Sequence, residues 1–250
     1  MTWRIDLNCD LGEGAGHDRE IIPYITSANI ACGVHAGSPE MMRQTALMAA
    51  QAGVGIGAHP GIGGAGGMGR QEVAVTPEEA YTLVLRQVAA MREVTDAHRL
   101  ELRHVKPHGT LYNLAARDAH VAKAVAEAVR DAGGGLILLA LAGSELVAAG
   151  RAAGLVVAAE AFADRTYQAD GTLTPRSDTG AMILDPALAA GRALMLIKAR
   201  KLLTVDGGEI ACQADTLCVH GDSPGAAEML GRLRQTLIRE GIEIRRLGQP

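Results

Sequence analysis

The chain has 250 residues, of which 48% are hydrophobic and 21% are charged, and its formal net charge is −4. This is ordinary globular composition, and the length suffices for one full hydrophobic core. Lysine and arginine are dispersed, and aromatic residues make up only 2% of the chain. The sequence therefore shows neither the basic surface nor the stacking platform that is typical of nucleic-acid-binding proteins.

No secretory signal and no membrane span are recognisable. The start of the sequence lacks a basic region followed by an apolar stretch, and the longest apolar run, near residues 135–142, suits a buried strand. The four cysteines show no paired metal-binding spacing, so we expect them to be reduced. We expect a cytoplasmic protein without a membrane or nucleic-acid partner.

Short apolar runs alternate with longer stretches of helical periodicity. We expect strands at residues 5–9, 28–32, 54–58, 102–106, 136–140, 156–161 and 216–220, with a last short run at 242–247. We expect helices at residues 39–52, 77–94, 118–132, 145–153, 186–205 and 225–240. Three of these helices open with a capping residue and a proline: Ser38-Pro39, Thr76-Pro77 and Asp185-Pro186. The alternation predicts a parallel sheet with helical crossovers, and residues 1–250 are expected to form a single barrel-like α/β domain.

Five predicted strands end in polar clusters whose residue types carry protons, bind anions or ligate metals. The clusters are Asp6-Leu7-Asn8-Cys9-Asp10, Asn29-Ile30-Ala31-Cys32-Gly33-Val34-His35, Ile56-Gly57-Ala58-His59-Pro60, His104-Val105-Lys106-Pro107-His108 and Cys218-Val219-His220-Gly221-Asp222. In a barrel of alternating strands and helices, the carboxyl ends of the strands share one face, where the active site lies. The sequence therefore predicts one site assembled from the whole length of the chain.

Asp10, His35 and His59 form a candidate carboxylate–imidazole cluster at neighbouring strand ends. Such a cluster either binds a divalent metal or carries acid–base chemistry. A satisfied, hydrogen-bonded network in the core is the alternative for each residue. No short-range metal-binding spacing decides between these interpretations.

Lys106 and Arg165 are candidate anion-binding residues. Lys106 closes an apolar strand two residues before His108, where it either stabilises a developing oxyanion or forms a buried ion pair with a strand-end carboxylate. A guanidinium group matches a carboxylate, so Arg165 and the later Arg176 are candidate carboxylate clamps, with a salt bridge inside the loop as the alternative.

The glycine-rich segment at residues 61–66 matches the spacing G-x-G-x-x-G, but we do not interpret it as a dinucleotide site. That fingerprint requires a glycine turn that opens a helix directly, and here the next helix is expected only near residue 77. We expect a flexible loop that acts as a lid. The sequence contains neither a phosphate-binding P-loop motif nor a G-x-S-x-G serine elbow.

Taken together, the segments 6–14, 25–37, 57–61, 104–113, 162–167 and 218–222 resemble the lactam-utilisation proteins, a family now known as the A subunits of 5-oxoprolinase. The resemblance runs in order through essentially the whole chain. It implies an irregular, TIM-like, seven-stranded (β/α) barrel, related to polysaccharide-deacetylase-like barrels, with the site at the strand carboxyl ends. It also implies ATP-dependent hydrolysis of a cyclic amide bond, which opens 5-oxo-L-proline to L-glutamate, with the B and C subunits of 5-oxoprolinase as partners.

The family positions that carry over are Asp10, Glu13, His35, His59, Lys106, His108, Arg165, His220 and Asp222. We expect catalytic residues among Asp10, Glu13, His35, His59, Lys106 and His108, and substrate-binding residues among Asn29, Arg165, His220 and Asp222. Asp10 or His59 is expected to activate water, Lys106 to stabilise the negative oxygen of the activated lactam, and Arg165 to hold its carboxylate.

A five-membered lactam is an unreactive amide, which explains why its hydrolysis is coupled to ATP. Because the chain lacks a phosphate loop, we expect ATP, with Mg²⁺, to be bound at least partly by the partner subunits. If a metal is bound here, its candidate ligands are Asp10, His35 and His59. Two alternatives stay open: a metal-dependent deacetylase or amidohydrolase that acts alone, and a non-catalytic protein that binds the lactam for its partners.

The chain departs from the usual family pattern mainly within the glycine-rich loop. Ile62-Gly63-Gly64 replaces a Tyr-Pro-Asp run, Met68 replaces a common Phe and Gln71 a common Arg, while Val34 and Ser38 replace Phe and Asp elsewhere. We expect these differences to affect the lid and the fit of the substrate more than the class of reaction.

Overall fold

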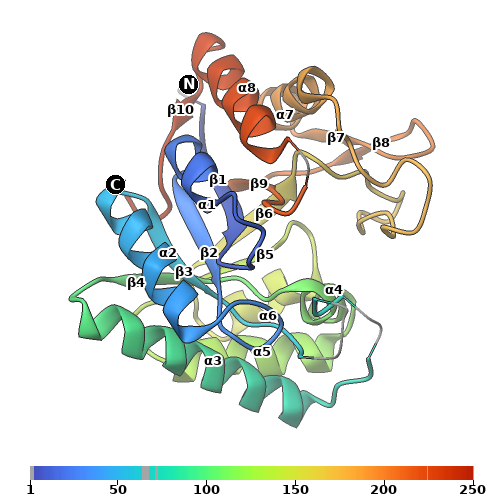
Figure 1. The fold of residues 1–250 in the computed structure, drawn as a ribbon. Coiled ribbons are helices and arrows are strands. Elements are labelled where there is room, and N and C mark those ends of the chain that lie inside the picture. The colour runs from blue at the N-terminus through green and yellow to red at the C-terminus, as the bar shows by residue number, and fades with distance from the viewer. Residues whose placement is uncertain (1–2, 64–67, 71–72, 224, 250) are drawn as a thin grey trace.

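Seven parallel strands close into a barrel in the computed structural model, which describes residues 3–63, 68–70, 73–223 and 225–249 (Figure 1). The strands are β1 (Arg4–Leu11), β2 (Ser27–Ala31), β3 (Gly55–His59), β4 (Leu102–Val105), β5 (Ile137–Leu141), β6 (Val157–Phe162) and β9 (Thr216–Val219). The barrel closes because β9 pairs in parallel with both β6 and β1. The expected α/β barrel is confirmed, and the short β10 (Glu243–Ile244) adds to the start of β1.

Helices lie around the outside of this barrel (Figure 1). They are α1 (Asp18–Ile21), the 3-10 helix η1 (Ile22–Tyr24), α2 (Pro39–Gln51), α3 (Pro77–Ala97), α4 (Gly109–Arg117), α5 (Ala119–Asp131), α6 (Glu145–Ala152), α7 (Pro186–Ala199) and α8 (Ala226–Arg239). All three predicted caps are formed, since the side chains of Ser38, Thr76 and Asp185 each accept a hydrogen bond from a backbone N–H of the first turn. These caps fix where α2, α3 and α7 begin.

Several elements differ from the sequence prediction, which also lacked α1 and η1. Helix α7 ends at Ala199, so the prediction of a helix to residue 205 was wrong: Arg200 takes a left-handed conformation with φ of 55°. The chain then forms the antiparallel hairpin β7 (Lys201–Leu203) and β8 (Glu209–Ala211) around a turn that contains Gly207. Helix α4 was also missed, because it follows the polar end of β4 without a capping side chain.

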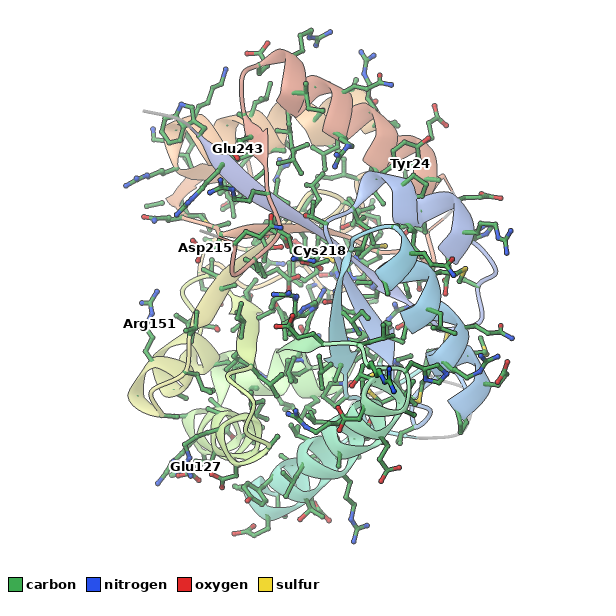
Figure 2. All side chains as sticks on the ribbon, turned by 90° about the vertical axis from the view of Figure 1, so that its left-hand side faces the viewer. Tyr24, Glu127, Arg151, Asp215, Cys218 and Glu243 are labelled. Carbon is green, nitrogen blue, oxygen red and sulfur yellow. The ribbon has the colours of Figure 1, made fainter. Side chains whose placement is uncertain are left out.

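Polar side chains line the faces of the barrel strands that point inward. Along β1, Asp6, Asn8 and Asp10 alternate with apolar residues of the core, and all three are at most 5% exposed. The Asn8 side chain reaches Glu160 of β6, Thr216 of β9 and Asn29 of β2, which places it inside the closed barrel. Figure 2 shows Cys218 deep in the interior, whereas Glu127 and Arg151 lie on outer helices. Buried polar groups of this kind require mutual hydrogen bonds.

Within the part of the chain that is described, no helix has the length and apolarity needed to cross a membrane. The cysteines Cys9, Cys32, Cys212 and Cys218 are all free thiols, as the sequence predicted.

Candidate functional site

Two asparagines and one aspartate form the base of the site inside the barrel. The Asn29 amide group donates hydrogen bonds to Asn8 Oδ1 at 2.8 Å and to Asp10 Oδ1 at 2.9 Å, and the Asn29 carbonyl oxygen accepts one from His104 Nε2 at 2.9 Å. Asn29 lies opposite Asp10 in the β1–β2 register, so the pairing of the strands creates this contact. The Asn29 side chain is therefore fully hydrogen-bonded, and one of its bonds holds Asp10 in place.

Lys106 lies directly above this base and is almost completely buried, with 2% of its surface exposed. Its ammonium group is 3.0 Å from Asp10 Oδ1, 2.9 Å from Glu160 Oε1 and 3.1 Å from Cys218 Sγ. Burial by itself would lower the pKa of Lys106, but the neighbouring acidic groups, Asp10 foremost, outweigh it and hold that pKa well above its usual value. The buried ion pair that the sequence left open is therefore present.

The carboxyl group of Asp10 joins this ion pair to the histidines. Its Oδ2 atom lies 3.4 Å from His59 Nε2, while Oδ1 accepts hydrogen bonds from Asn29 and Lys106. Burial would raise the pKa of Asp10, yet His59 and Lys106 together keep that pKa well below its usual value. Asp10 is thus a carboxylate at neutral pH, with one oxygen directed at an imidazole.

Three histidines gather on the other side of Asp10. His59 ends β3, His108 precedes α4, and His35 lies in the loop after β2. The rings of His35 and His108 are stacked with centroids 3.9 Å apart, and His59 meets both rings edge-on. Burial is the main cause that lowers the pKa values of His35 and His108, so these rings are neutral near pH 7.

Glu13 completes this cluster from the loop that follows β1. Its Oε1 atom lies 3.3 Å from His35 Nε2, 3.4 Å from His108 Nδ1 and 4.0 Å from His59 Nε2. In the described part of the chain, Glu13, His35, His59 and His108 are the one group of three or more His, Cys, Asp or Glu side chains arranged closely enough to hold a metal ion. Asp10, named with His35 and His59 as a candidate ligand, lies beside this group rather than within it.

The glycine-rich loop reaches the cluster through its backbone. The carbonyl oxygen of Met68 accepts a hydrogen bond from His108 Nε2 at 2.8 Å. The Gln87 side chain accepts a hydrogen bond from the Gly61 N–H and donates one to the Gly61 carbonyl oxygen. A Cβ atom at Gly61 would lie 2.5 Å from His35 Nδ1, so only glycine allows this approach. Residues 64–67 and 71–72, which include Gln71, are outside the described residues.

A second charged group lies around His220 and Asp222. His220 Nδ1 is 2.9 Å from Asp164 Oδ2, which also accepts the His220 backbone N–H. Burial would raise the pKa of Asp164, but the charge and hydrogen bonds of His220, together with the charge of Arg165, lower it below its usual value, so Asp164 is ionised. Asp222 Oδ2 accepts a hydrogen bond from Arg70 at 2.6 Å and lies 4.0 Å from Arg176.

Arg165, which the sequence marked as a candidate carboxylate clamp, is buried. Only 5% of its surface is exposed, and its guanidinium group donates to the backbone carbonyl oxygens of Thr174 and Ala181. Burial and the nearby Arg176 lower its pKa to about 10. In this conformation Arg165 fixes the segment between β6 and α7, whereas Arg70 and Arg176 are more exposed cations near Asp222.

The structure thus brings Asp10, Glu13, His35, His59, Lys106 and His108 into one connected network. His220 and Asp222 lie in the second group with Asp164 and Arg70. Sequence reasoning did not place Glu160 among the candidates, although it lies near the end of a predicted strand, as Asp10 lies just after one. It also missed Arg70, because no motif or strand end in the sequence marks that position.

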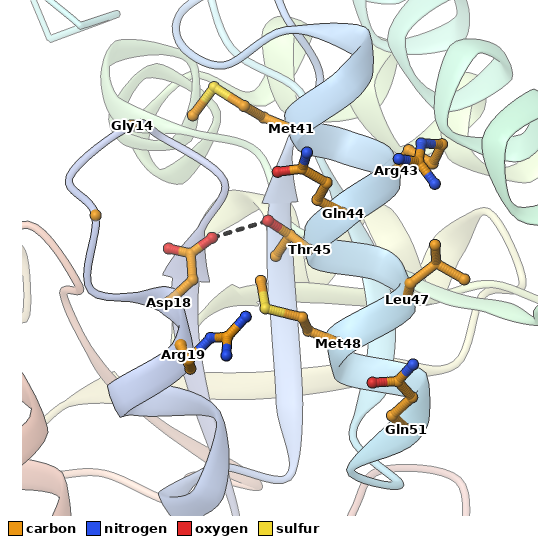
Figure 3. Close-up of a pocket in the computed structure, with 11 residues that line it drawn as sticks. Gly14, Asp18, Arg19, Met41, Arg43, Gln44, Thr45, Leu47, Met48 and Gln51 are labelled. Carbon is orange, nitrogen blue, oxygen red and sulfur yellow. Dashed lines mark hydrogen bonds between the residues drawn. The ribbon is translucent and has the colours of Figure 1, made fainter.

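A groove of about 450 Å³ lies on the outside of the barrel between the loop after β1 and α2 (Figure 3). Asp18 crosses it and accepts a hydrogen bond from Thr45 at 2.8 Å. The remaining lining includes Met41, Met48 and polar or charged side chains such as Gln44 and Arg43. No convergent acid–base group faces this groove, so the candidate site is the network at the barrel end.

His104 gives a prediction for stability at acidic pH. Its ring is 1% exposed, and burial, followed by the charge of Lys106, lowers its pKa to about 3. The unfolded chain takes up a proton on this histidine near pH 6.5, which the folded chain refuses until about pH 3. The free energy of unfolding is therefore highest above pH 6.5 and falls as the pH is lowered, by about 2 kcal/mol between pH 7 and pH 5.

His104→Gln should reduce this loss, because the glutamine amide can still donate to Asn29 but does not titrate. Denaturant unfolding of both proteins at pH 7, 6 and 5 measures the difference. Equal pH dependence in the wild type and His104→Gln would show that His104 is not the residue responsible.

Comparisons with known proteins place the chain in a family. Residues 5–250 match the model of the LamB/YcsF family. The chain is 52% identical over 244 residues to the A subunit of 5-oxoprolinase from Geobacillus kaustophilus, covering 96% of this chain and 95% of that protein. It is 50% identical over 249 residues to the A subunit of 5-oxoprolinase from Bordetella pertussis, covering 98% and 99%.

Solved structures agree with these matches. The lactam utilization protein from Thermus thermophilus has a TM-score of 0.90 and 46% identity, covering 97% of this chain and 99% of that one. A T48 deacetylase has a TM-score of 0.52 at 12% identity over 98% of this chain and 89% of that one, a likeness of fold alone. On the strength of the near full-length matches, this chain belongs to the LamB/YcsF family.

Proposed function

We propose that this chain is the barrel subunit of a 5-oxoprolinase, which opens the lactam ring of 5-oxo-L-proline to give L-glutamate. The observation that carries the proposal is the pair of relatives named for the A subunit of 5-oxoprolinase, which are 52% and 50% identical over nearly the whole chain. The site supports it, since buried carboxylate, imidazole and ammonium groups meet at one end of the barrel.

Within this proposal, the cluster around Asp10 and His59 activates the water that attacks the lactam carbon. Asp10 Oδ2 and His59 Nε2 are 3.4 Å apart, so one water molecule can contact both. His59 Nδ1 is fixed at 2.7 Å from the Lys106 carbonyl oxygen, which holds the ring in one orientation. Lys106 contributes positive charge next to the developing oxyanion and also fixes Asp10.

We further propose that the reaction is coupled to ATP, because an unstrained five-membered amide resists attack by water. Phosphorylation of the amide oxygen by ATP makes the carbon more electrophilic, so that water adds to it. The C–N bond then breaks as the ring nitrogen takes up a proton, and hydrolysis of the resulting acyl phosphate releases L-glutamate and phosphate. The sequence holds no phosphate-loop motif, which supports binding of ATP and Mg²⁺ at least partly by partner subunits, named B and C in the family. Arg70 and Arg176 are the nearby cations best exposed to meet an anionic group.

The test is glutamate release and ATP hydrolysis with 5-oxo-L-proline, measured for the chain alone and with its partner subunits. We expect negligible turnover by the isolated chain and ATP-coupled turnover by the mixture. Robust ATP-dependent glutamate production by the chain alone would contradict the dependence on partners. Amide cleavage without ATP would instead identify a hydrolase that acts alone.

A further inference from the structure

The hydrogen bonds of His59 and His108 cannot all be satisfied while both rings are neutral. His59 Nδ1 is 2.7 Å from the carbonyl oxygen of Lys106, and His108 Nε2 is 2.8 Å from the carbonyl oxygen of Met68. A carbonyl oxygen only accepts hydrogen bonds, so both of these nitrogens carry hydrogen. In the neutral form of both rings, the opposite nitrogens, His59 Nε2 and His108 Nδ1, then present lone pairs to each other at 2.9 Å.

Two facing lone pairs at this distance repel each other unless a cation binds to both. A shared proton would satisfy only these two nitrogens, whereas four side chains converge here. Glu13 Oε1 lies 3.4 Å from His108 Nδ1, 4.0 Å from His59 Nε2 and 3.3 Å from His35 Nε2. One donor atom from each of the four residues lies within 4.8 Å of every other.

These separations match the edges of a metal coordination shell. For metal–ligand bonds of about 2.1 Å, neighbouring ligand atoms are about 3.0 Å apart in an octahedron and about 3.4 Å apart in a tetrahedron. The distances of 2.9, 3.3 and 3.4 Å fall at these values, the distance from Glu13 to His59 is longer at 4.0 Å, and all four atoms lie within 4.8 Å of one another. Backbone carbonyls that fix the second nitrogen of His59 and His108 are the usual support of metal-binding histidines.

The site is also enclosed. At most 4% of each of the four side chains is exposed, and in the described part of the chain the buried His35 Nδ1 has no hydrogen-bond partner. The backbone closes over the rings at Gly61 and Gly69, where a Cβ atom would come within 2.5 Å and 3.0 Å of His35 atoms. Such an enclosed group of convergent donors is typical of a ligand-binding site rather than of a solvated surface.

We propose that Glu13, His35, His59 and His108 bind one divalent transition-metal cation. Three imidazoles and one carboxylate favour Zn²⁺, Co²⁺, Ni²⁺ or Fe²⁺ over Mg²⁺, which prefers oxygen ligands. With His59 Nε2 bound to the cation, Asp10 would remain as the base. The cation would supply Lewis acidity beside it, at the place where the proposed reaction needs activation of a water or carbonyl oxygen. The metal site itself follows from the geometry and does not depend on the identity of the substrate.

Metal binding is tested on the full chain after removal of bound ions with a chelator. Calorimetric titration with Zn²⁺ should give one ion per chain, and Co²⁺ should produce visible absorption bands that report ligand geometry. Glu13→Gln and His108→Ala should weaken Zn²⁺ binding at least about tenfold. His120→Ala, at an exposed histidine on α5, is the matched control and should bind as the wild type does.

Thermal melting with and without Zn²⁺ checks that each variant is folded, and the wild type should melt at a higher temperature with the ion. If His108→Ala fails to fold, Glu13→Gln, which keeps the shape of the side chain, decides the result. Absence of stoichiometric binding by the folded wild type would overturn the proposal, as would equal binding by Glu13→Gln. Either failure would leave the 5-oxoprolinase proposal standing, because that is measured by glutamate release.

Discussion

Replacing Lys106 with methionine should lower the free energy of unfolding by about 3–5 kcal/mol at pH 7. The substitution keeps most of the side-chain volume but leaves Asp10 and Glu160 buried without their shared cation, which lies 3.0 Å and 2.9 Å from them. An uncompensated buried charge costs far more than the loss of a surface ion pair. Urea-induced unfolding, followed by circular dichroism, measures the change.

Lys123→Met is the matched control, because this lysine is 73% exposed on α5 and lies 4.0 Å from Glu127. We expect a change of less than about 1 kcal/mol there. If Lys106→Met unfolds with the same free energy as the wild type, the ion pair is not what stabilises the barrel interior. If stability is unchanged but turnover falls about a hundredfold to a thousandfold, the role of Lys106 is to stabilise the oxyanion and not the fold.

Asp10→Asn should abolish turnover of the reconstituted complex while the chain remains folded. The asparagine retains the shape of the side chain and an oxygen that accepts hydrogen bonds from Asn29 and Lys106. It removes the negative charge that faces His59 Nε2 at 3.4 Å, and with it the proposed activation of water. Lys106 keeps Glu160 as a counter-charge, so the barrel should still close.

Steady-state glutamate release and thermal melting of the same preparations test this prediction. Asp118→Asn is a suitable control, because Asp118 is an exposed cap of α5 and asparagine caps helices equally well. Full activity of Asp10→Asn would make Asp10 a structural residue. The base would then be His59, or His220, which Asp164 orients.

The elements of this fold were largely predictable because their signals are local. Ser38, Thr76 and Asp185 cap the helices that their sequence positions indicated. Each predicted barrel strand is present, since apolar runs of that length suit strands that are buried on both faces. The failure at residues 200–205 came from apolar residues that fit a helix and a hairpin equally well, and a left-handed Arg200 decides for the hairpin.

The sequence by itself also determined which residue types stand at the strand ends, because a polar residue after an apolar run is visible without any contact. Only the tertiary structure decided which of them meet. Asn8 and Thr216 touch across 208 positions of the chain, and Lys106 finds Asp10 and Glu160 only once β9 has closed the barrel onto β1. The hydrogen positions on His59 and His108 depend on two backbone carbonyls that no spacing predicts. Partners, burial and charge states are properties of the closed barrel, so local patterns located the candidate site but not its chemistry.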